Sequence, residues 1–281
     1  MADAELPTET AVGRVELRVN DLDAVRDFYE DIVGLEVRHA EAGRAALGAG
    51  GAELLRLVAD PDAPERERDE TGLFHTAFRV PTRSGLGGAL ARIEREWDLT
   101  GASDHRVSEA LYLSDPEDNG VEVYCDRPRE TWPITDDGRV AMDTRPLDLE
   151  DLRAAAGGDD KVPGGTDVGH VHLEVSAIPD VKKFYVDTLG LGVRQTYGSQ
   201  AVFVAAGDYH HHVGANSWNG RSSPPGGRGL EWFELVVPDR EALEAVRERV
   251  ETADRTATTT DDTLELTDPD GIVVRIRASG R

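Results

Sequence analysis

Seven of the eight histidines of this 281-residue chain fall into two stretches, which makes a metal or acid–base site the first chemistry to consider. They are His75, His105, His170, His172, His210, His211 and His212. A single histidine is more often a surface or hydrogen-bonded structural residue than a ligand, but that explanation does not account for such clustering, and only His39 lies elsewhere. Because Cys125 is the only cysteine, a bound metal needs imidazole and carboxylate ligands rather than thiolates.

The segments that carry these histidines repeat along the chain, with a period of roughly 50 to 60 residues. The sequence GRVELRV at 13–19, with FY at 28–29 and GL at 34–35, recurs as GHVHLEV at 169–175, with FY at 184–185 and GL at 190–191. Each copy predicts a strand and then a helix, over 23–32 or 179–188, that ends at Gly-Leu. Strands are expected next at 45–47 and 53–58, and at 201–205 and 210–214, so the repeated unit is βαβββ.

Two weaker copies begin at 74–80 and 231–237 and continue through predicted helices at 86–96 and 240–250. Both finish in a strand, an Asp-Pro turn and a strand, at 111–123 and 264–276. We therefore expect four βαβββ modules, at residues 11–60, 72–126, 167–218 and 228–278. A crossing connection at 127–166, with a short helical stretch at 149–156, separates the second module from the third.

These motifs together resemble the vicinal oxygen chelate proteins, which include glyoxalases, thiol-transferring resistance proteins and extradiol dioxygenases. More narrowly, GHVHLEV, GDYHHHVGANSW and DHRVSEALYLSDPEDNGVEVYCDRP resemble the catechol 2,3-dioxygenase group with four such modules. The resemblance extends over nearly the whole chain. It implies an α+β fold in which the four modules form two open-barrel domains, and an iron(II) extradiol dioxygenase that opens catechol-like aromatic diols with O2.

The resemblance also indicates where metal ligands belong. His75 and His170 occupy the ligand position on the first strand of the second and third modules, and Glu122 occupies the carboxylate position on the last strand of the second. The corresponding positions of the other modules hold residues that do not ligate divalent cations, namely Arg14, Trp232 and Arg275. The complete set is therefore two imidazoles and one carboxylate, the usual arrangement in non-heme iron(II) enzymes that activate oxygen. Mn(II) is the alternative metal.

The modules must pair in a particular way for these ligands to meet. If neighbouring modules shared a barrel, His75 and Glu122 would lie in one barrel and His170 in the other. We therefore predict that modules 2 and 3 pair around the metal, and that modules 1 and 4 form a metal-free barrel. The His Nε2 and Glu oxygen atoms would then lie roughly 2.0–2.2 Å from the ion and about 3–4 Å from one another.

Acid–base and substrate-binding residues are also implied by the resemblance. The histidine run is expected on the last strand of the third module, where it points to His212 as the residue that moves protons near the oxygen site, with His211 as the alternative. His210 shares the face of His212 by strand alternation, and one of the three is alternatively a fourth metal ligand or a structural residue. Tyr112, ten residues before Glu122, matches the tyrosine that hydrogen-bonds the substrate oxygen.

His105 is a weaker candidate for contact with the metal ligands or the substrate. Four further residues are less distinctive. His172 and Glu174 share the face of His170, and they either orient the ligands or face water on an edge strand. We interpret the other two, Cys125 and Trp218, as structural.

Composition excludes several classes of partner. The net charge is −24, from 31 basic and 55 acidic residues, and such a field repels nucleic acid and anionic lipid. Only three of the basic residues are lysines, and this pattern indicates adaptation to high salt. No apolar run is long enough to span a membrane and the start lacks the pattern of a signal peptide, so a cytoplasmic location is expected.

Two other functions remain open from the sequence. A metal-dependent glyoxalase-like isomerase or thiol transferase would use a fourth protein ligand in place of one open coordination position. A non-catalytic binding protein would hold no metal. The sequence does not determine the ring substituents of the substrate, the choice between iron and manganese, or the oligomeric state, although a homo-oligomer is compatible with it.

Overall fold

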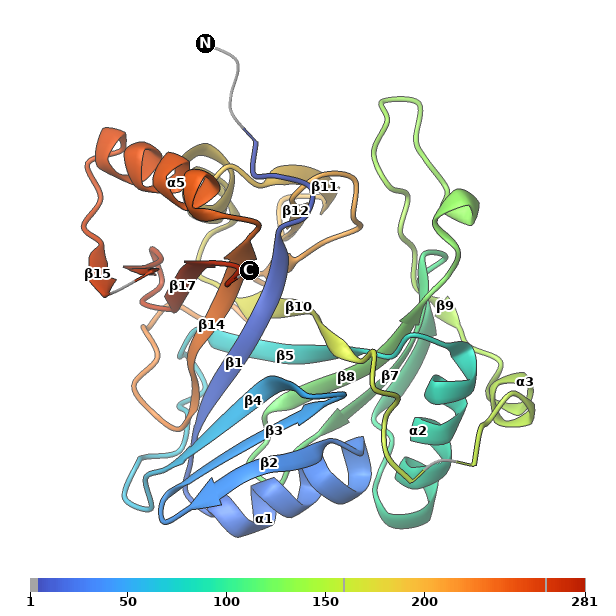
Figure 1. Cartoon of the computed structure of the whole chain (residues 1–281). Coiled ribbons are helices and arrows are strands. Elements are labelled where there is room, and N and C mark those ends of the chain that lie inside the picture. Colours follow the sequence, from blue (N-terminus) through green and yellow to red (C-terminus); the bar gives the residue numbers. More distant parts are fainter. Residues whose placement is uncertain (1–4, 159, 261, 281) are drawn as a thin grey trace. The chain divides into compact units, whose positions relative to one another are not determined.

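The computed structural model describes residues 5–158, 160–260 and 262–280, in which the order βαβββ recurs four times (Figure 1). The first module contains β1 (Ala11–Val19), α1 (Leu22–Asp27), β2 (Glu36–Glu41), β3 (Arg44–Ala49) and β4 (Ala52–Ala59). The second contains β5 (Gly72–Arg79), α2 (Arg83–Glu96), β6 (Gly101–Asp104), β7 (Ser108–Ser114) and β8 (Gly120–Asp126). The predicted α+β class and the repeated unit are confirmed.

The remaining elements follow the same order after the connection. The connection contains a 3-10 helix (Arg129–Thr131), β9 (Arg145–Pro146) and α3 (Leu149–Ala154). The third module contains β10 (Asp167–Glu174), α4 (Ile178–Val181), β11 (Gly192–Tyr197), β12 (Ala201–Ala205) and β13 (Val213–Asn216). The fourth contains β14 (Gly229–Val237), α5 (Arg240–Thr252), β15 (Thr258–Thr260), β16 (Thr263–Thr267) and β17 (Val273–Ala278).

The chain divides into two compact units. Unit 1 comprises the chain up to Val15, residues 64–74, and the chain from His170 on, and it contains strands in the orders β15-β16-β17-β14 and β11-β12-β13-β10. Unit 2 comprises residues 16–63 and 75–169, with strands in the orders β1-β4-β3-β2 and β5-β8-β7-β6-β9. The division falls inside β1, β5 and β10, so each of these strands contributes residues to both units.

Each long helix buries one face against the strands of its own unit (Figure 1). The Thr82 hydroxyl caps α2 by accepting from Gly85 N, and Leu86, Leu90 and Ile93 bury the face that packs towards β8. In unit 1 the Asp239 carboxylate caps α5 in the same way, and that helix packs on β14 and β17. Apolar residues at helical spacing therefore fix these helices on their strands.

The first helices of modules 1 and 3 differ from the expected form. The helix predicted over 23–32 is α-helical only to Asp27 and continues as a π-helix (Phe28–Val33), and the one predicted over 179–188 continues as a π-helix (Lys182–Thr188). The first ends at Gly34, whose φ of +92° is available at little cost only to glycine. An extra residue in the last turn brings Phe28 and Tyr29 onto the buried face together.

Two other differences concern the third module and the connection. β13 begins at Val213, so the three histidines lie in the loop before it and strand alternation does not decide which of them face together. The helix expected at 149–156 ends at Ala154. Within the described ranges, no helix combines the length and apolar character needed to cross a bilayer.

Candidate functional site

Unit 2 holds the first part of the candidate site, on β5 and β8. These strands are parallel, and their register places Ala77 opposite Glu122, so that the carboxylate is one alternation step from His75. The His75 Nε2 and Glu122 Oε2 atoms lie 2.9 Å apart, and both side chains are buried. A buried carboxylate against a buried imidazole is a pair that costs free energy unless charges are balanced.

The fourth module shows what the same positions become without ligating residues. The β14–β17 register places Glu234 opposite Arg275, so Trp232 and Arg275 correspond to His75 and Glu122, as the repeats in the sequence indicate. The Arg275 guanidinium lies 4.2 Å from the centroid of the Trp232 ring, and it donates to Glu265. A cation–π stack fills these positions, and its charge is already paired.

Unit 1 holds His170 and the histidine run. The His170 ring lies 4.0 Å from that of His211 and 6.0 Å from that of His210, measured between centroids. The Nδ1 atoms of His210 and His211 are 2.7 Å apart, so one of them carries the proton that the other accepts. His170, His172 and Glu174 share one face of β10 and all are buried, which excludes the alternative that this face is open to water.

His212 has a different environment from its neighbours. Its Nδ1 accepts a hydrogen bond of 3.2 Å from Ala206 N, and its ring lies 5.0 Å from that of Tyr209. Since a backbone amide can only donate, Nδ1 carries no proton, and the neutral ring is protonated on Nε2. The backbone thus fixes the tautomer of His212, which a residue that moves protons requires.

Tyr112 lies directly opposite Glu122 in the antiparallel register of β7 and β8, as its ten-residue spacing predicts. Burial raises the pKa of Tyr112 well above its ordinary value, and the Glu122 carboxylate adds to this effect, so the phenol stays neutral. The phenol oxygen lies 2.7 Å from His105 Nε2, and His105 Nδ1 lies 2.8 Å from the Asp143 carbonyl oxygen. Because that carbonyl can only accept, Nδ1 donates to it and Nε2 is left to accept from Tyr112.

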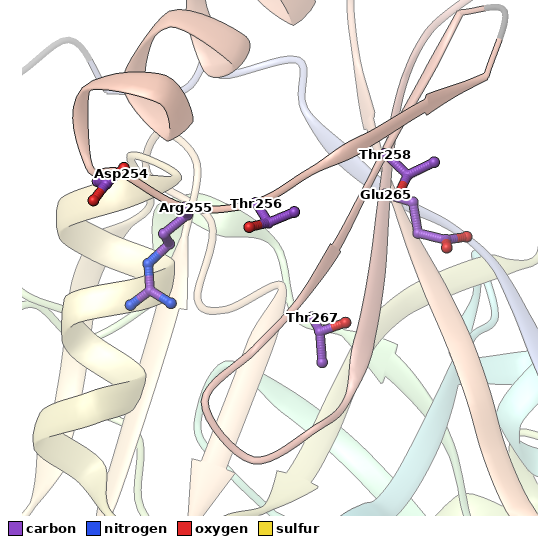
Figure 2. A pocket seen from close by; sticks show the side chains of 6 residues that line it. All are labelled: Asp254, Arg255, Thr256, Thr258, Glu265 and Thr267. Atoms are coloured by element: carbon purple, nitrogen blue, oxygen red, sulfur yellow. The ribbon is translucent and has the colours of Figure 1, made fainter.

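The remaining histidine and the cysteine lie where they contribute little to this chemistry. His39 is exposed, beside Glu41, and Cys125 is buried, where desolvation raises its thiol pKa to about 11. Figure 2 shows a separate pocket of unit 1 whose six lining residues, from Asp254 to Thr267, include no histidine. Sequence reasoning missed Asp143, because no motif marks a backbone carbonyl, and it treated Trp218 as structural although its side chain is 47% exposed.

The donor chemistry fits a first-row metal ion. Each unit supplies part of such a donor set: His75 and Glu122 are buried in unit 2, and His170 is buried in unit 1. Two imidazoles with one carboxylate match the ligand preference of Fe(II), Mn(II) and Zn(II). These are the three residues that the sequence predicts as ligands, and their convergence on one ion stays a prediction.

Comparison with known proteins places the chain in a family. The model of the Glyoxalase/Bleomycin resistance protein/Dioxygenase superfamily matches residues 11–123 and 167–276. The chain belongs to this superfamily. A catechol-2,3-dioxygenase of Bacillus subtilis (strain 168) is 40% identical over 269 residues, which cover 93% of this chain and 94% of that protein.

Two solved structures share the fold. A proposed dioxygenase from Bacillus subtilis subsp. subtilis str. 168 has a TM-score of 0.66 at 14% identity, covering 99% of this chain and 87% of that one. Glyoxalase I from Zea mays has a TM-score of 0.58 at 14% identity, covering 96% and 92%. At these identities the similarity concerns the fold. The dioxygenase relative and the glyoxalase-like fold imply a metal ion in this superfamily member.

Proposed function

We propose that this protein is an iron(II)-dependent extradiol dioxygenase that opens catechol-like aromatic diols with O2. The buried set of His75, Glu122 and His170 carries the proposal, because it supplies the two-histidine, one-carboxylate donors of this chemistry. The catechol-2,3-dioxygenase relative, 40% identical along 93% of the chain, supports the same reaction and substrate class. Mn(II) in place of Fe(II) is compatible with the donors.

Contacts along β5 and β10 support the pairing of modules 2 and 3 that this ligand set requires. In unit 1 the Phe74 ring lies 5.2 Å from that of His172, and in unit 2 Arg79 Nη2 lies 2.6 Å from Asp167 Oδ2. Each of these contacts joins β5 to β10 within one unit, and this supports a pairing of modules 2 and 3. In unit 1, Arg14 of β1 donates to Glu234 of β14, which supports the pairing of modules 1 and 4.

The chain's own residues would then divide the work. A bound ferrous ion would supply redox and Lewis-acid chemistry at the diol. Tyr112, held neutral and oriented by His105, hydrogen-bonds a diol oxygen, while His212 moves protons from its Nε2, with His211 as the alternative for this role. Asp143, in the connection, holds the tautomer of His105.

One observation favours a second candidate. The His211 ring lies 4.0 Å from that of His170, and this proximity favours His211 as a fourth protein ligand, as in a metal-dependent isomerase or thiol transferase. Metal content with oxygen uptake distinguishes the two: iron with oxygen consumption supports the dioxygenase, and nickel or zinc without it supports the alternative.

The test is an anaerobic reconstitution with Fe(II), followed by catechol and then air. We expect oxygen uptake and a yellow ring-opened product from the wild-type protein, and neither from His75→Ala or Glu122→Ala. The exposed His39→Ala variant is the matched control and should retain activity. Bound iron without oxygen uptake from any catechol would overturn the proposal.

A further inference from the structure

A continuous series of rings leads away from the histidine run within unit 1. The His211 ring lies 5.0 Å from that of Phe203, and Phe203 lies 5.6 Å from His172. His172 in turn lies 5.8 Å from Trp218, and Phe203 lies 5.8 Å from Tyr197. All these separations are in the range of favourable aromatic pairs. Each step covers 5.0–5.8 Å, so the series is longer than a single catechol ring.

The series runs from the interior to the surface. His211, Phe203 and His172 are 7%, 8% and 4% exposed, whereas Tyr197 is 40% and Trp218 is 47% exposed. Phe74, which is partly buried, packs its ring 5.8 Å from Trp218 and closes one side of the series. Apolar and aromatic walls with a few polar groups at one end are typical of small-molecule sites.

Trp218 is held by the face of β10 that carries His170. The Trp218 backbone N donates to Asn216 Oδ1 over 3.2 Å, and Asn216 Nδ2 donates to His172 Nε2 over 3.1 Å. On the other side of Trp218, Asn219 Nδ2 lies 2.5 Å from Glu174 Oε1. Because residues 170, 172 and 174 alternate onto one face, a single strand places both the metal-ligand candidate and the loop that presents the indole.

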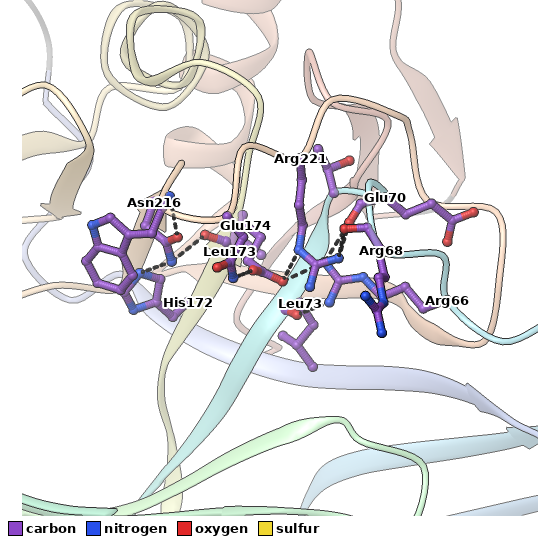
Figure 3. Close-up of polar contacts among 12 residues, drawn as sticks. Arg66, Arg68, Glu70, Leu73, His172, Leu173, Glu174, Asn216 and Arg221 are labelled. Carbon is purple, nitrogen blue, oxygen red and sulfur yellow. Dashed lines mark hydrogen bonds and ion pairs between the residues drawn. The ribbon is translucent and has the colours of Figure 1, made fainter.

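Glu174 is itself held by two arginines (Figure 3). Its side chain is 4% exposed, and its Oε2 lies 2.7 Å from Arg221 Nε and 2.9 Å from Arg66 Nη2. Arg221 also donates to the carbonyls of Arg68 and Glu70, which ties the loop after Trp218 to the segment before β5. A buried carboxylate shared by two guanidiniums fixes geometry, since breaking it would leave an unpaired buried charge.

The charge around this series of rings determines which substituents it can accept. Both guanidiniums are already engaged by Glu174 and by backbone carbonyls, so they offer little to an anionic substituent. The net charge of −24 further disfavours carboxylate-bearing substrates. A flat, uncharged group is the remaining complement to an indole and a phenyl ring.

We infer that Trp218 and Phe203 form a specificity wall that receives an aryl substituent of the diol, and that Asn216, Asn219 and Glu174 are positioning residues for Trp218. The inference rests on the proposed function and specifies its substrate class as aryl-substituted catechols. The ring that is cleaved lies towards the histidines, and the substituent lies along the wall towards the surface.

The test compares catechol with a phenyl-substituted catechol on the iron-loaded enzyme. For Trp218→Ala we expect kcat/KM for the phenyl-substituted diol to fall by about 10-fold or more, through KM, while catechol changes by less than about 2-fold. Trp218→Phe should retain most of the wild-type kcat/KM for the phenyl-substituted diol. Asn219→Ala should lower this kcat/KM by a smaller factor than Trp218→Ala. Trp97→Ala, which removes an indole of similar exposure in unit 2, is the control. Equal effects on both diols, or no effect, would overturn the inference.

A binding measurement separates this inference from the proposed function. A hydroxybiphenyl has both rings but a single hydroxyl, and calorimetry should show tighter binding of it than of phenol to the wild-type protein. Trp218→Ala should abolish that preference. If the preference holds but no diol is cleaved, the aryl site stands and the dioxygenase proposal fails. If catechol is cleaved without any such preference, the wall is not a specificity element.

Discussion

At the residue scale, the fixed tautomer of His212 leads to a prediction about turnover. Its Nδ1 accepts from Ala206 N, so Nε2 is the atom that exchanges protons. His212→Ala should retain bound iron but lose about 10²–10⁴ in kcat, the usual contribution of a positioned acid–base group. Stopped-flow turnover with metal analysis of the same sample measures both. Retained turnover with iron bound would assign the role to His211, whose ring lies against that of His170.

Tyr112 gives a second prediction at this scale. Because burial raises its pKa, the phenol keeps its proton, which it donates to His105 Nε2, and the phenol oxygen is left to accept a hydrogen bond from a hydroxyl of the diol. Tyr112→Phe should keep the fold and the metal, and kcat/KM for catechol should fall by roughly 2- to 10-fold, as expected for the loss of one neutral hydrogen bond to the substrate. An unchanged kcat/KM in an iron-replete variant would show that Tyr112 only packs against its neighbours.

At the element scale, the Asp-Pro turns are attached to the helices of the preceding modules in the same way in both units. Tyr185 donates to Asp268 Oδ2 over 3.0 Å, and Asp268 Oδ1 accepts from the backbone of Asp270 and Ile272. Tyr29 and Asp115 make the equivalent contact at 3.4 Å. Burial raises the pKa of each aspartate from 3.8 to about 6, against the opposing effect of these hydrogen bonds.

This raised pKa predicts a pH dependence of stability. The folded state binds the Asp268 proton more tightly than the unfolded state, so this group destabilises the fold at neutral pH, and the penalty declines as pH falls from about 6 towards 3.8, below which it is gone. When the pH is lowered from 7 to 5, the free energy of unfolding should therefore rise by about 1 kcal/mol less for Asp268→Asn than for the wild type. Urea unfolding at both pH values measures this.

The control for that experiment is Asp180→Asn, which removes the same charge from an exposed position. Ionic strength is kept high and constant, so that general charge repulsion contributes little to the difference. If Asp268→Asn and Asp180→Asn show the same dependence on pH, burial of the turn aspartate does not affect stability in this range.

At the scale of the whole molecule, the net charge of −24 should make folding depend on salt. Close carboxylates repel one another in dilute buffer, and the Debye length falls from about 30 Å at 0.01 M to about 3 Å at 1 M salt. We expect the melting temperature to rise steadily from low to molar KCl. Sucrose at matched osmolality is the control for solvent exclusion, and a melting temperature that stays flat in KCl would contradict adaptation to high salt.

Local patterns in the sequence determined the elements and the ligand positions within them. Strand alternation placed His170, His172 and Glu174 on one face, and the length of the hairpin around the Asp-Pro turn placed Tyr112 opposite Glu122. These relations depend on periods of two residues and on turn length, which neighbouring residues fix by themselves. The pairing of modules 2 and 3 and of modules 1 and 4, also deduced from the sequence, stays a prediction.

Only the tertiary structure shows which groups of the loops contact one another. The position of His211 against His170, the Asp143 carbonyl on His105, and the attachment of Trp218 to β10 all join segments without a repeating pattern. Where no period constrains the backbone, the conformation follows from hydrogen bonds and packing with residues far along the chain. The sequence therefore determined the chemistry that unit 1 and unit 2 can offer, whereas packing decided the orientation of its histidines and of the aromatic wall.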